Sequence, residues 1–387
     1  MMSWILLICK GSKIGGYLGD ISGAFDRVCK EYLLAKLHAA GVGATYLNFL
    51  DSYLSPRQAQ VIVEGAASDK FDIANSVFQG TVLGPPLWNV FFADIIRAAC
   101  STGGEPSTFA DDLGVFQQFD REMPEEDAFS TLRECRESVH KWGRVNRVAF
   151  DADKEHLILI HPIYAAGDPF KLLGCMTDCE LTMDVVIERM LAKVRPKITA
   201  ILRTRFHYTT KDLISQFKTH VWGLMEAHNG GIFHAATSWL DKIDGAQRRF
   251  LREIEMTESQ AFLDHNFASP TLRRNIGILG MLHKRTLGMC HPLMEKLLPT
   301  WQQRFGRQRP DKHSKQIYGS FLEVQWQRGL FDRSIFAMCG TYNDLPQYVV
   351  DAPTVSLFQK HLTHIARTRC ENALPNWMYT FDRRSRH

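Results

Sequence analysis

The chain has 387 residues, of which 45% are hydrophobic and 23% charged, a composition typical of a globular protein with a sizeable core. The apolar run at residues 4–9 is too short to span a membrane and lacks the basic start and small-residue cleavage site of a signal peptide. Nine cysteines, an odd number without a C-x-x-C pair, argue against a disulfide framework. We therefore expect an intracellular protein, nuclear or cytoplasmic, that is neither secreted nor in a membrane.

The net charge of +4 conceals an uneven distribution of charge along the chain. Residues 1–190 hold 17 Lys and Arg against 26 Asp and Glu, whereas residues 191–387 hold 29 against 16. An acidic segment can hold divalent cations, and a basic segment can contact a polyanion such as a nucleic-acid backbone. The basic excess can equally be ordinary solvated surface, and charge alone does not separate these interpretations.

Short strands and helices alternate in the first half of the chain, and helices dominate the second half. In chain order, apolar periodicity and turn residues predict a strand at 17–21, helices at 24–40 and 45–54, a hairpin of 58–64 and 71–77, a buried helix at 85–99, strands at 107–110 and 113–116, a helix at 127–144 and a strand at 156–161. A further hairpin starts at residue 170, and from about residue 181 the pattern is helical.

Three aspartates lie at the ends of predicted strands. Asp20 closes the first strand, and Asp111 and Asp112 form the turn between the strands at 107–110 and 113–116. If these strands are neighbours in one sheet, the carboxylates meet at its edge and repel one another unless a cation neutralises them. Oxygen ligands without nearby His or Cys favour Mg²⁺ or Mn²⁺ over zinc. Taken alone, the same residues can also be a polar turn and a helix cap.

Three motifs carry a resemblance to a known family. Residues 17–28 contain D-x-x-x-A-F-D-x-V, residues 78–89 contain a Q-G pair and G-P-x-L, and residues 109–112 read F-A-D-D. In order and spacing they resemble motifs A, B and C of the reverse transcriptases of non-LTR retrotransposons. Residues 146–154 resemble motif D, although Glu155 stands where the family has Thr or Ser, and Leu172-Leu173-Gly174 resemble motif E.

The resemblance implies an α+β fold, namely the palm of a right-hand polymerase, in which an antiparallel sheet is backed by helices, followed by a helical thumb. We expect the palm, with a remnant of the fingers, at residues 1–180 and a basic helical thumb at residues 181–300. A C-terminal region at residues 301–387 has no role that the sequence identifies.

The resemblance also implies roles for the acidic residues. Asp20 and Asp111 would bind two Mg²⁺ or Mn²⁺ ions, with Asp112 beside them in a supporting role as a third metal ligand. Such ions can activate a primer 3′-hydroxyl and stabilise the departing pyrophosphate. Lys154 would be a candidate general acid for that pyrophosphate, although an exposed surface lysine explains the same residue.

Four residues would lie at the incoming nucleotide. Ile21 and Phe25 belong to motif A, and the ring of Phe25 would pack under the sugar and exclude a 2′-hydroxyl. Gln79 and Gly80 would lie where the template base meets the nucleotide, since glycine permits close approach of the backbone. Phe25 can instead be a core side chain, and Gln79-Gly80 a plain turn.

Clustered arginines suit a thumb that holds nucleic acid by its phosphates. We expect contacts from Arg203, Arg205, Arg248 and Arg249. The arginines of residues 244–252 can equally be the solvated face of an amphipathic helix. The implied partners are an RNA template, a DNA primer and deoxynucleoside triphosphates.

In the family a fingers segment, and commonly an endonuclease domain, precedes motif A, yet only 19 residues precede Asp20. We therefore expect a truncated copy, a cropped gene model or a fragment of a larger polyprotein whose upstream segments act with it. Two hypotheses stay open: an RNA-directed DNA polymerase, and a catalytically inactive remnant that binds nucleic acid. A two-metal phosphohydrolase unrelated to polymerases would leave Phe25 and Gln79 without a role.

Overall fold

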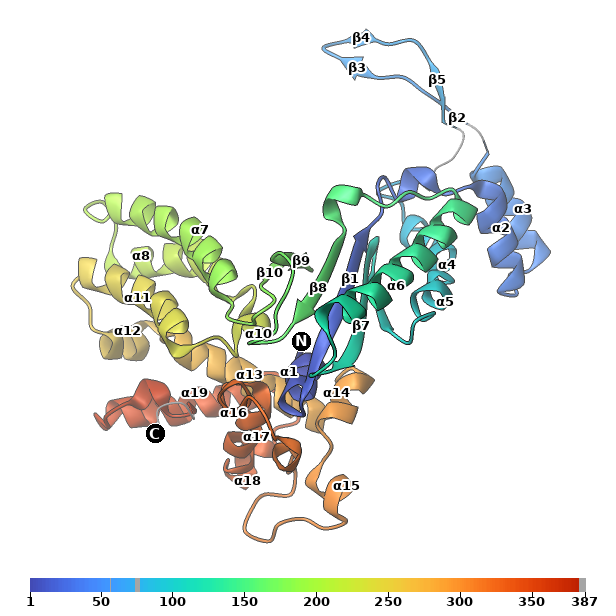
Figure 1. Ribbon diagram of the computed structural model, residues 1–387. Helices are drawn as coiled ribbons and strands as arrows, with labels where there is room; N and C mark the ends of the chain where they lie inside the picture. Colours follow the sequence, from blue (N-terminus) through green and yellow to red (C-terminus); the bar gives the residue numbers. More distant parts are fainter. Residues whose placement is uncertain (56, 74–76, 383–387) are drawn as a thin grey trace. The chain divides into compact units, whose positions relative to one another are not determined.

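The computed structural model describes residues 1–55, 57–73 and 77–382, which form two compact units (Figure 1). The sheet unit comprises Lys13–Ile160 and Tyr164–Asp168. The helical unit comprises Met1–Ser12, His161–Ile163 and the chain from Pro169 onward. Within the described residues, no helix has both the length and the apolar character that crossing a membrane requires.

A four-stranded sheet of order β6-β7-β1-β8 is the centre of the sheet unit. β1 pairs antiparallel with β8, with Tyr17 opposite Leu157, and β6 pairs antiparallel with β7, with Phe109 opposite Asp112. A Cβ at Gly15 would collide with the ring of Phe119, so glycine lets large side chains of the sheet close over β1. The strands are β1 (Ser12–Asp20), β6 (Glu105–Phe109), β7 (Asp112–Asp120) and β8 (His156–Ile160).

Helices pack beside this sheet and share an aromatic core with it (Figure 1). Tyr17, Trp88 and Phe91 are fully buried there, and burial of such large rings is a major source of stability. The helices are α2 (Lys30–Ala39), α3 (Ala44–Tyr53), α4 (Gly84–Phe92), α5 (Ile95–Ala99) and α6 (Glu125–Asn146), with 3₁₀ turns at Phe25–Arg27 and Ala152–Lys154.

Two predicted helices differ from those in the structure. The helix expected at 24–40 begins as a single 3₁₀ turn, and α2 starts only at Lys30 because Val28 and Cys29 have extended backbones. The helix expected at 85–99 divides at Asp94, whose carboxylate accepts hydrogen bonds from Lys36 and Trp142. The first boundary is set by the local backbone of Val28 and Cys29, and at the second Asp94 contacts partners distant in sequence.

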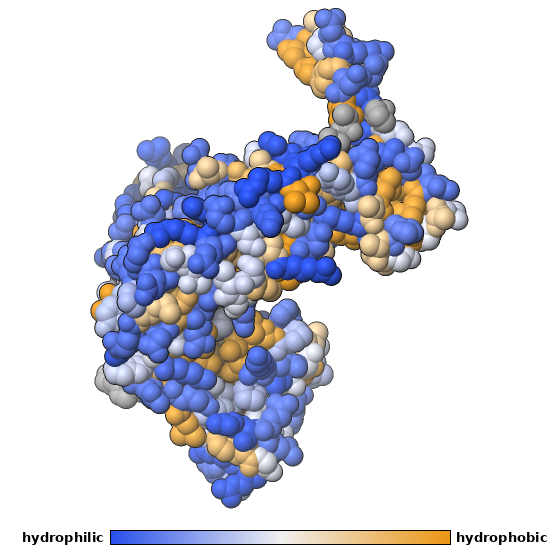
Figure 2. Space-filling view, turned by 45° about the vertical axis from the view of Figure 1, so that its right-hand side comes forward, coloured by the Kyte–Doolittle hydropathy of each residue, from blue (hydrophilic) through white to orange (hydrophobic). Residues whose placement is uncertain are grey.

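The predicted hairpin forms an arm that extends from the sheet unit (Figure 1). β2 (Arg57–Ala59) pairs with β5 (Phe71–Ile73), and β3 (Ile62–Val63) pairs with β4 (Ala66–Ala67). Its expected strand at 71–77 lies partly outside the described residues. Apolar side chains reach solvent on this arm, which shows as orange surface beside blue in Figure 2, and Ile62 is 68% exposed.

The helical unit confirms the helical pattern predicted after residue 181. Beside the short hairpin of β9 (Phe170–Leu172) and β10 (Cys175–Thr177), Phe217, Phe250 and Phe267 pack together in its core. The α-helices are α1 (Met2–Cys9), α7 (Asp184–Arg203), α8 (Thr210–Phe217), α9 (Gly223–Glu226), α10 (Asn229–Ile232), α11 (Thr237–Glu253), α12 (Glu258–His265), α13 (Pro270–Thr286), α14 (Pro292–Leu297), α15 (Trp301–Phe305), α16 (Arg328–Asp332), α17 (Ile335–Asn343), α18 (Gln347–Val350) and α19 (Val355–Glu371). The expected α+β class, with an antiparallel sheet and a helical C-terminal part, is therefore confirmed.

A buried histidine joins α13 to α17 and α19. His283 Nε2 lies 2.9 Å from the Ala352 carbonyl oxygen and Nδ1 lies 3.0 Å from the Tyr342 hydroxyl, while the ring stacks on Phe358. A neutral ring satisfies both contacts, because Nε2 can donate to the carbonyl while Nδ1 accepts from the hydroxyl. Burial lowers the pKa of His283, and it also lowers the pKa of His313 nearby in the same unit.

These histidines predict that acidification destabilises the helical unit. The folded chain holds them neutral, whereas the unfolded chain takes up protons below its ordinary pKa of 6.5, so stability falls as pH decreases through that value. We expect His283→Gln to reduce the stability lost between about pH 7.5 and about pH 5.5 by about 1 kcal/mol. Urea unfolding of both proteins at the two pH values measures this, and equal pH dependence would contradict it.

Candidate active site

The ends of two neighbouring strands bring Asp20 and Asp112 to the same edge of the sheet. β7 lies beside β1, so the condition that these strands are neighbours in one sheet is met. A Cβ at Gly16 would lie 3.2 Å from the Phe116 ring, and one at Gly114 would lie 3.4 Å from Leu18 Cδ2. Moving forward along β1 therefore means moving backward along β7. Asp20, the last residue of β1, accordingly lies at the end where β7 begins with Asp112.

The turn that carries Asp111 and Asp112 is held by a tryptophan from α4. Trp88 Nε1 donates a hydrogen bond of 2.8 Å to the Ala110 carbonyl oxygen, and Ala110 has a left-handed backbone with φ of 54°. A non-glycine residue in this region is strained and persists only where its surroundings fix it. Asp111 is half-buried and Asp112 is exposed, so both carboxylates are accessible at the turn.

Lys154 neutralises Asp20. Its Nζ lies 2.6 Å from Asp20 Oδ2 and 3.5 Å from Asp151 Oδ2, and the hydrogen bond with Asp20 raises the pKa of Lys154. The Asp151 amide also donates to the Asp20 carbonyl oxygen at 2.9 Å, so the backbone here follows the end of β1. Lys154 thus comes from motif D to the first aspartate of motif A.

Glu155, where this chain departs from the family pattern, is an anchor beside Lys154. Its Oε1 accepts a hydrogen bond of 2.6 Å from the Tyr17 hydroxyl and lies 2.7 Å from His140 Nε2. Burial raises the pKa of Tyr17, so its hydroxyl stays a proton donor. Neither Tyr17 nor His140 is among the site residues predicted from the sequence. The acidic residue directly after Lys154 is the only hint in the sequence, and it does not indicate that Tyr17 and His140 are its partners.

The four predicted nucleotide residues have different surroundings. Ile21 is buried and forms a β-bridge with Phe150. Phe25 is half-buried and stacks on Trp88 at 5.9 Å between ring centroids. Gln79 and Gly80 are exposed, and Gly80 has φ of 80°, a backbone conformation that favours glycine. Trp88 therefore links Phe25 to the turn of the aspartates, a role that sequence reasoning missed although the residue lies within motif B.

The residues at this edge fit a divalent cation by their chemistry. Carboxylate oxygens are the ligands that Mg²⁺ and Mn²⁺ prefer, and Asp20, Asp111 and Asp112 supply them without competing thiolates or imidazoles from the same motifs. The described residues include no group of three or more His, Cys, Asp and Glu side chains placed to hold a metal ion. Lys154 supplies the positive charge at Asp20 in this arrangement.

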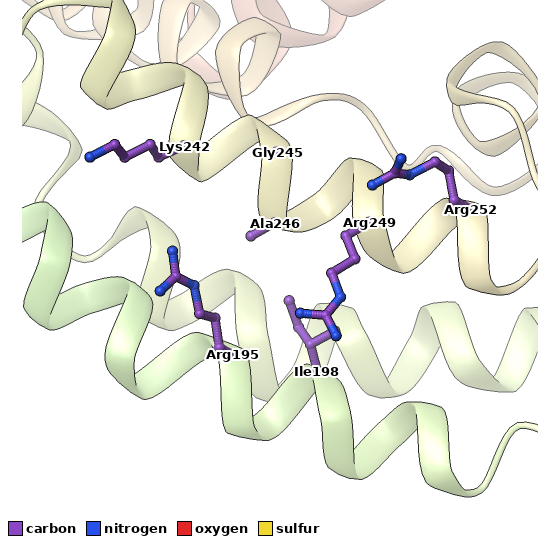
Figure 3. A pocket seen from close by; sticks show the side chains of 7 residues that line it. All are labelled: Arg195, Ile198, Lys242, Gly245, Ala246, Arg249 and Arg252. Carbon is purple, nitrogen blue, oxygen red and sulfur yellow. The ribbon is translucent and has the colours of Figure 1, made fainter.

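Basic side chains line a groove between α7 and α11 of the helical unit. Figure 3 shows Arg195 on α7 and three basic residues of α11 around a hollow of about 350 Å³. On α11 the groove residues are Lys242, Arg249 and Arg252, whose spacing places them on one helical face. We call Arg195, Lys242, Arg249 and Arg252 the basic groove.

The predicted nucleic-acid contacts divide between this groove and its surroundings. Arg249 lines it, Arg205 lines an adjoining hollow of about 580 Å³ together with Arg249 and Arg252, and Arg203 lines a third hollow with Arg195. Arg248 does not line any of these hollows. Sequence reasoning missed Lys242 and Arg252, which the i, i+7 and i, i+10 spacings on α11 would have identified.

An antiparallel sheet backed by helices, with aspartates at adjacent strand ends, is the arrangement of a polymerase palm. Residues 10–177 match the family model described as reverse transcriptase (RNA-dependent DNA polymerase). The chain is thus related to the RNA-directed DNA polymerases of non-LTR retrotransposons, which confirms the resemblance carried by motifs A, B and C.

Curated relatives agree with this assignment. The chain is 26% identical over 263 residues to a probable RNA-directed DNA polymerase from transposon X-element of Drosophila melanogaster, which covers 61% of this chain and 27% of the relative. It is 33% identical over 146 residues to the RNA-directed DNA polymerase from mobile element jockey of the same species, covering 36% and 15%. The chain spans about a quarter of the length of the first of these relatives.

The contact between Lys154 and Asp20 predicts competition between the lysine and a metal ion. We expect Lys154→Met to bind Mn²⁺ about threefold more tightly, because the carboxylate loses its internal cation while the neighbouring acids stay. Mn²⁺ titration followed by water proton relaxation measures the affinity. Lys141→Met, on exposed surface of α6, is the matched control. Unchanged or weaker Mn²⁺ binding by Lys154→Met would contradict the competition.

Proposed function

We propose that the sheet unit carries an RNA-directed DNA polymerase site, which extends a DNA primer along an RNA template. The observation that supports it best is the placement of Asp20 and Asp112 at the same end of adjacent strands. Asp20 and Asp111 would hold two Mg²⁺ or Mn²⁺ ions, with Asp112 beside them. When bound, such ions activate the primer 3′-hydroxyl and stabilise the negative charge of the leaving pyrophosphate.

Phe25 gives this site a means of selecting deoxynucleotides. Its ring is half-buried and rests on Trp88, so it has little freedom to move aside for a larger sugar. A 2′-hydroxyl next to a fixed aromatic ring meets both steric overlap and loss of hydration. Gly80 permits close approach of its backbone, because no Cβ lies in the way and its φ suits glycine alone.

Lys154 suits the role of proton donor to the leaving pyrophosphate. Its raised pKa keeps it protonated at neutral pH, and its contact with Asp20 keeps the ammonium at the acidic edge. Glu155, bonded to Tyr17 and His140, fixes the backbone from which Lys154 extends. The lysine would leave Asp20 for the departing phosphate, because both are anionic partners of the same ammonium group.

The basic groove of the helical unit suits the sugar-phosphate backbone of a template–primer duplex. Arg195 and Arg249 face one another across it from two helices, so a phosphate strand between them would meet cations on both sides (Figure 3). Residues 181–300 would then act as the thumb of the polymerase, after a palm at residues 1–180. Arg203 and Arg205 would extend the contact along the surface.

A catalytically inactive nucleic-acid-binding remnant is the alternative. The contact that favours it is the ion pair of Lys154 with Asp20, since an ammonium group on the first metal ligand opposes the cation that catalysis needs. The basic groove would serve such a remnant equally well.

Primer extension separates the two functions. We expect incorporation of deoxythymidine on an oligo(dT)-primed poly(rA) template with Mg²⁺ or Mn²⁺, and a loss of about a thousandfold or more in Asp111→Asn, since the carboxylate's charge would be lost while its shape is kept. Asp120→Asn, at the far end of β7, is the matched control. Template binding without incorporation by the unchanged chain would identify the remnant instead.

Charge reversal in the groove tests the thumb. We expect Arg249→Glu combined with Arg252→Glu to weaken binding of an RNA–DNA duplex about tenfold or more and to reduce its salt dependence, since fewer counterions are released. Fluorescence anisotropy over a range of salt concentrations measures both quantities. Arg328→Glu combined with Arg133→Glu, at exposed positions that do not line the groove, is the control of equal charge. Equal affinities of the two double variants would contradict a specific groove.

A further inference from the structure

Aromatic rings gather at the start of the C-terminal region, beyond the reverse-transcriptase match. Trp301 stacks near Phe321 at 6.2 Å and contacts Phe305 at 4.7 Å between ring centroids. Phe305 meets Tyr318 edge to face at 5.2 Å, and Tyr318 is buried beneath the other rings. Phe305 and Phe321 remain 38% and 41% exposed. The rings of Phe305 and Phe321 therefore reach solvent while they pack on Trp301 and Tyr318.

Arginines surround these rings. Arg304 lies 5.6 Å from the centroid of Tyr318 and its guanidinium is 3.2 Å from Glu323, while Arg309 lies 5.3 Å from the centroid of Trp301. Arg307 between them is exposed. Residues 301–315 contain five Lys and Arg but a single acid, Asp311. Glu323 and Asp311 each pair with one of these arginines, Arg304 and Arg309, so the arginines are held beside the rings.

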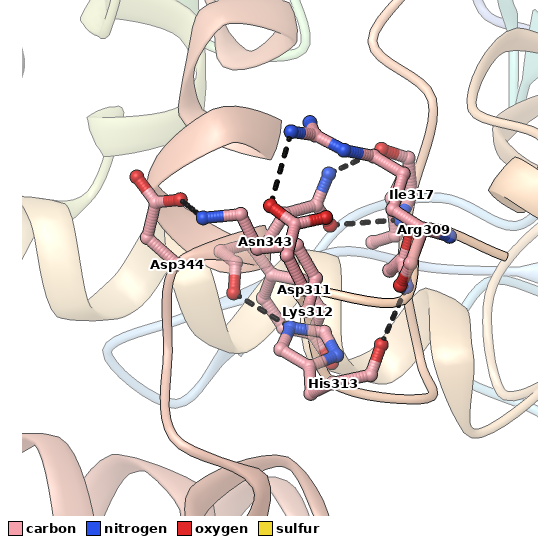
Figure 4. A network of polar contacts seen from close by, with 9 residues as sticks. Arg309, Asp311, Lys312, His313, Ile317, Asn343 and Asp344 are labelled. Atoms are coloured by element: carbon pink, nitrogen blue, oxygen red, sulfur yellow. Dashed lines mark hydrogen bonds and ion pairs between the residues drawn. The ribbon is translucent and has the colours of Figure 1, made fainter.

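The loop that carries Arg307 and Arg309 is fixed to α17 without regular secondary structure of its own (Figure 4). Asn343 accepts from the Ile317 amide at 2.9 Å and donates to the Ile317 carbonyl oxygen at 2.8 Å. His313 lies 2.9 Å from the Tyr342 carbonyl oxygen, and Lys312 pairs with Asp344 at 2.8 Å. Gln316 forms two further hydrogen bonds with the backbone of Arg309. A ligand would therefore not have to order this loop, which removes a common cost of binding.

We propose that this surface binds single-stranded nucleic acid, with unpaired bases stacked on Phe305 and Phe321 and phosphates held by the arginines. The residues of this stacking surface are Trp301, Arg304, Phe305, Arg307, Arg309, Tyr318 and Phe321. Exposed rings that alternate with arginines are how sequence-tolerant single-strand binders hold bases and backbone together. Bases of a duplex are covered by their neighbours, so exposed ring faces favour a single strand. Arginines beside exposed rings suit phosphates and bases together, which favours a nucleic-acid strand over a protein partner.

The proposal does not rest on polymerase activity, because the stacking surface lies outside residues 10–177 and outside the basic groove. It gives residues 301–326 a function that neither the motifs nor the family match supplies. If the chain also acts as a polymerase, this surface would hold an unpaired stretch of template or primer strand.

Replacement of the two exposed rings tests the stacking. Phe305→Leu combined with Phe321→Leu keeps apolar volume but removes both ring faces. In anisotropy titrations of the full chain with fluorescein-labelled single strands of uridylate or thymidylate, we expect this variant to bind both about tenfold or more weakly than the unchanged chain. An abasic strand of equal length keeps the phosphates but has no bases, so the substitutions should leave its affinity unchanged.

Controls separate this outcome from general damage and from the thumb. Tyr46→Leu removes a ring that is 70% exposed on α3 and should leave single-strand binding unchanged. The double Leu variant should bind an RNA–DNA duplex like the unchanged chain, whereas the groove variants of Arg249 and Arg252 lose the duplex. Duplex binding therefore tests the proposed thumb, and single-strand binding tests the stacking surface. Thermal unfolding checks that each variant is folded.

Two outcomes would overturn the proposal. Unchanged affinity of the double Leu variant for both single strands would exclude stacking and leave an apolar protein partner as the occupant. An equal loss for the abasic strand would show a structural effect rather than base stacking. Should the double variant not fold, Arg307→Glu replaces it as the test, because Arg307 is exposed. We expect this variant to bind both single strands about fivefold more weakly. Unchanged binding would contradict the proposal.

Discussion

The antiparallel alignment of β1 and β7 is the constraint on which the acidic edge of the sheet unit depends. Antiparallel strands β1 and β7 bring Asp20 and Asp112 to the same end, and Asp111 lies one residue before. Carboxylates at this edge are stabilised by nearby positive charge. Lys154 supplies positive charge at Asp20, and the contact of Trp88 with Ala110 fixes the turn. Both devices come from segments far from β1 in sequence.

Much of this edge could be predicted from the sequence because its motifs are local. A strand followed by Asp20, a glycine-punctuated loop before a Pro-initiated helix, and two aspartates in a turn each leave a pattern within a dozen residues, and each corresponds to an element of the structure. That β1 and β7 are neighbours was only a condition at the level of the sequence, and the structure supplies it. Helix boundaries at Lys30 and Asp94 did not follow, because they depend on the backbone at Val28 and on distant partners of Asp94.

The side-chain contacts that organise the site could not be predicted from the sequence, for a physical reason. Lys154 and Asp20, like Tyr17 and Glu155, are separated by more than a hundred residues, and nothing local to either member specifies its partner. The basic groove is an intermediate case, because the face of α11 with Lys242, Arg249 and Arg252 is a helical periodicity visible in the sequence. The position of Arg195 of α7 opposite this face depends on tertiary packing and cannot be read from the sequence.

Glu155 connects the departure from the family pattern to the behaviour of the site. A Thr or Ser at this position offers a short hydroxyl, whereas the longer carboxylate accepts hydrogen bonds from Tyr17 in the core of β1 and contacts His140 on α6. Glu155 is next to Lys154 in sequence, yet its carboxylate is turned toward Tyr17 and His140 while the Lys154 ammonium points to Asp20. Glu155 and Lys154, although adjacent in sequence, therefore contact different parts of the sheet unit. One fixes the backbone at the edge of the sheet, and the other neutralises the aspartate there, so a change at Glu155 would act on Asp20 through the position of Lys154.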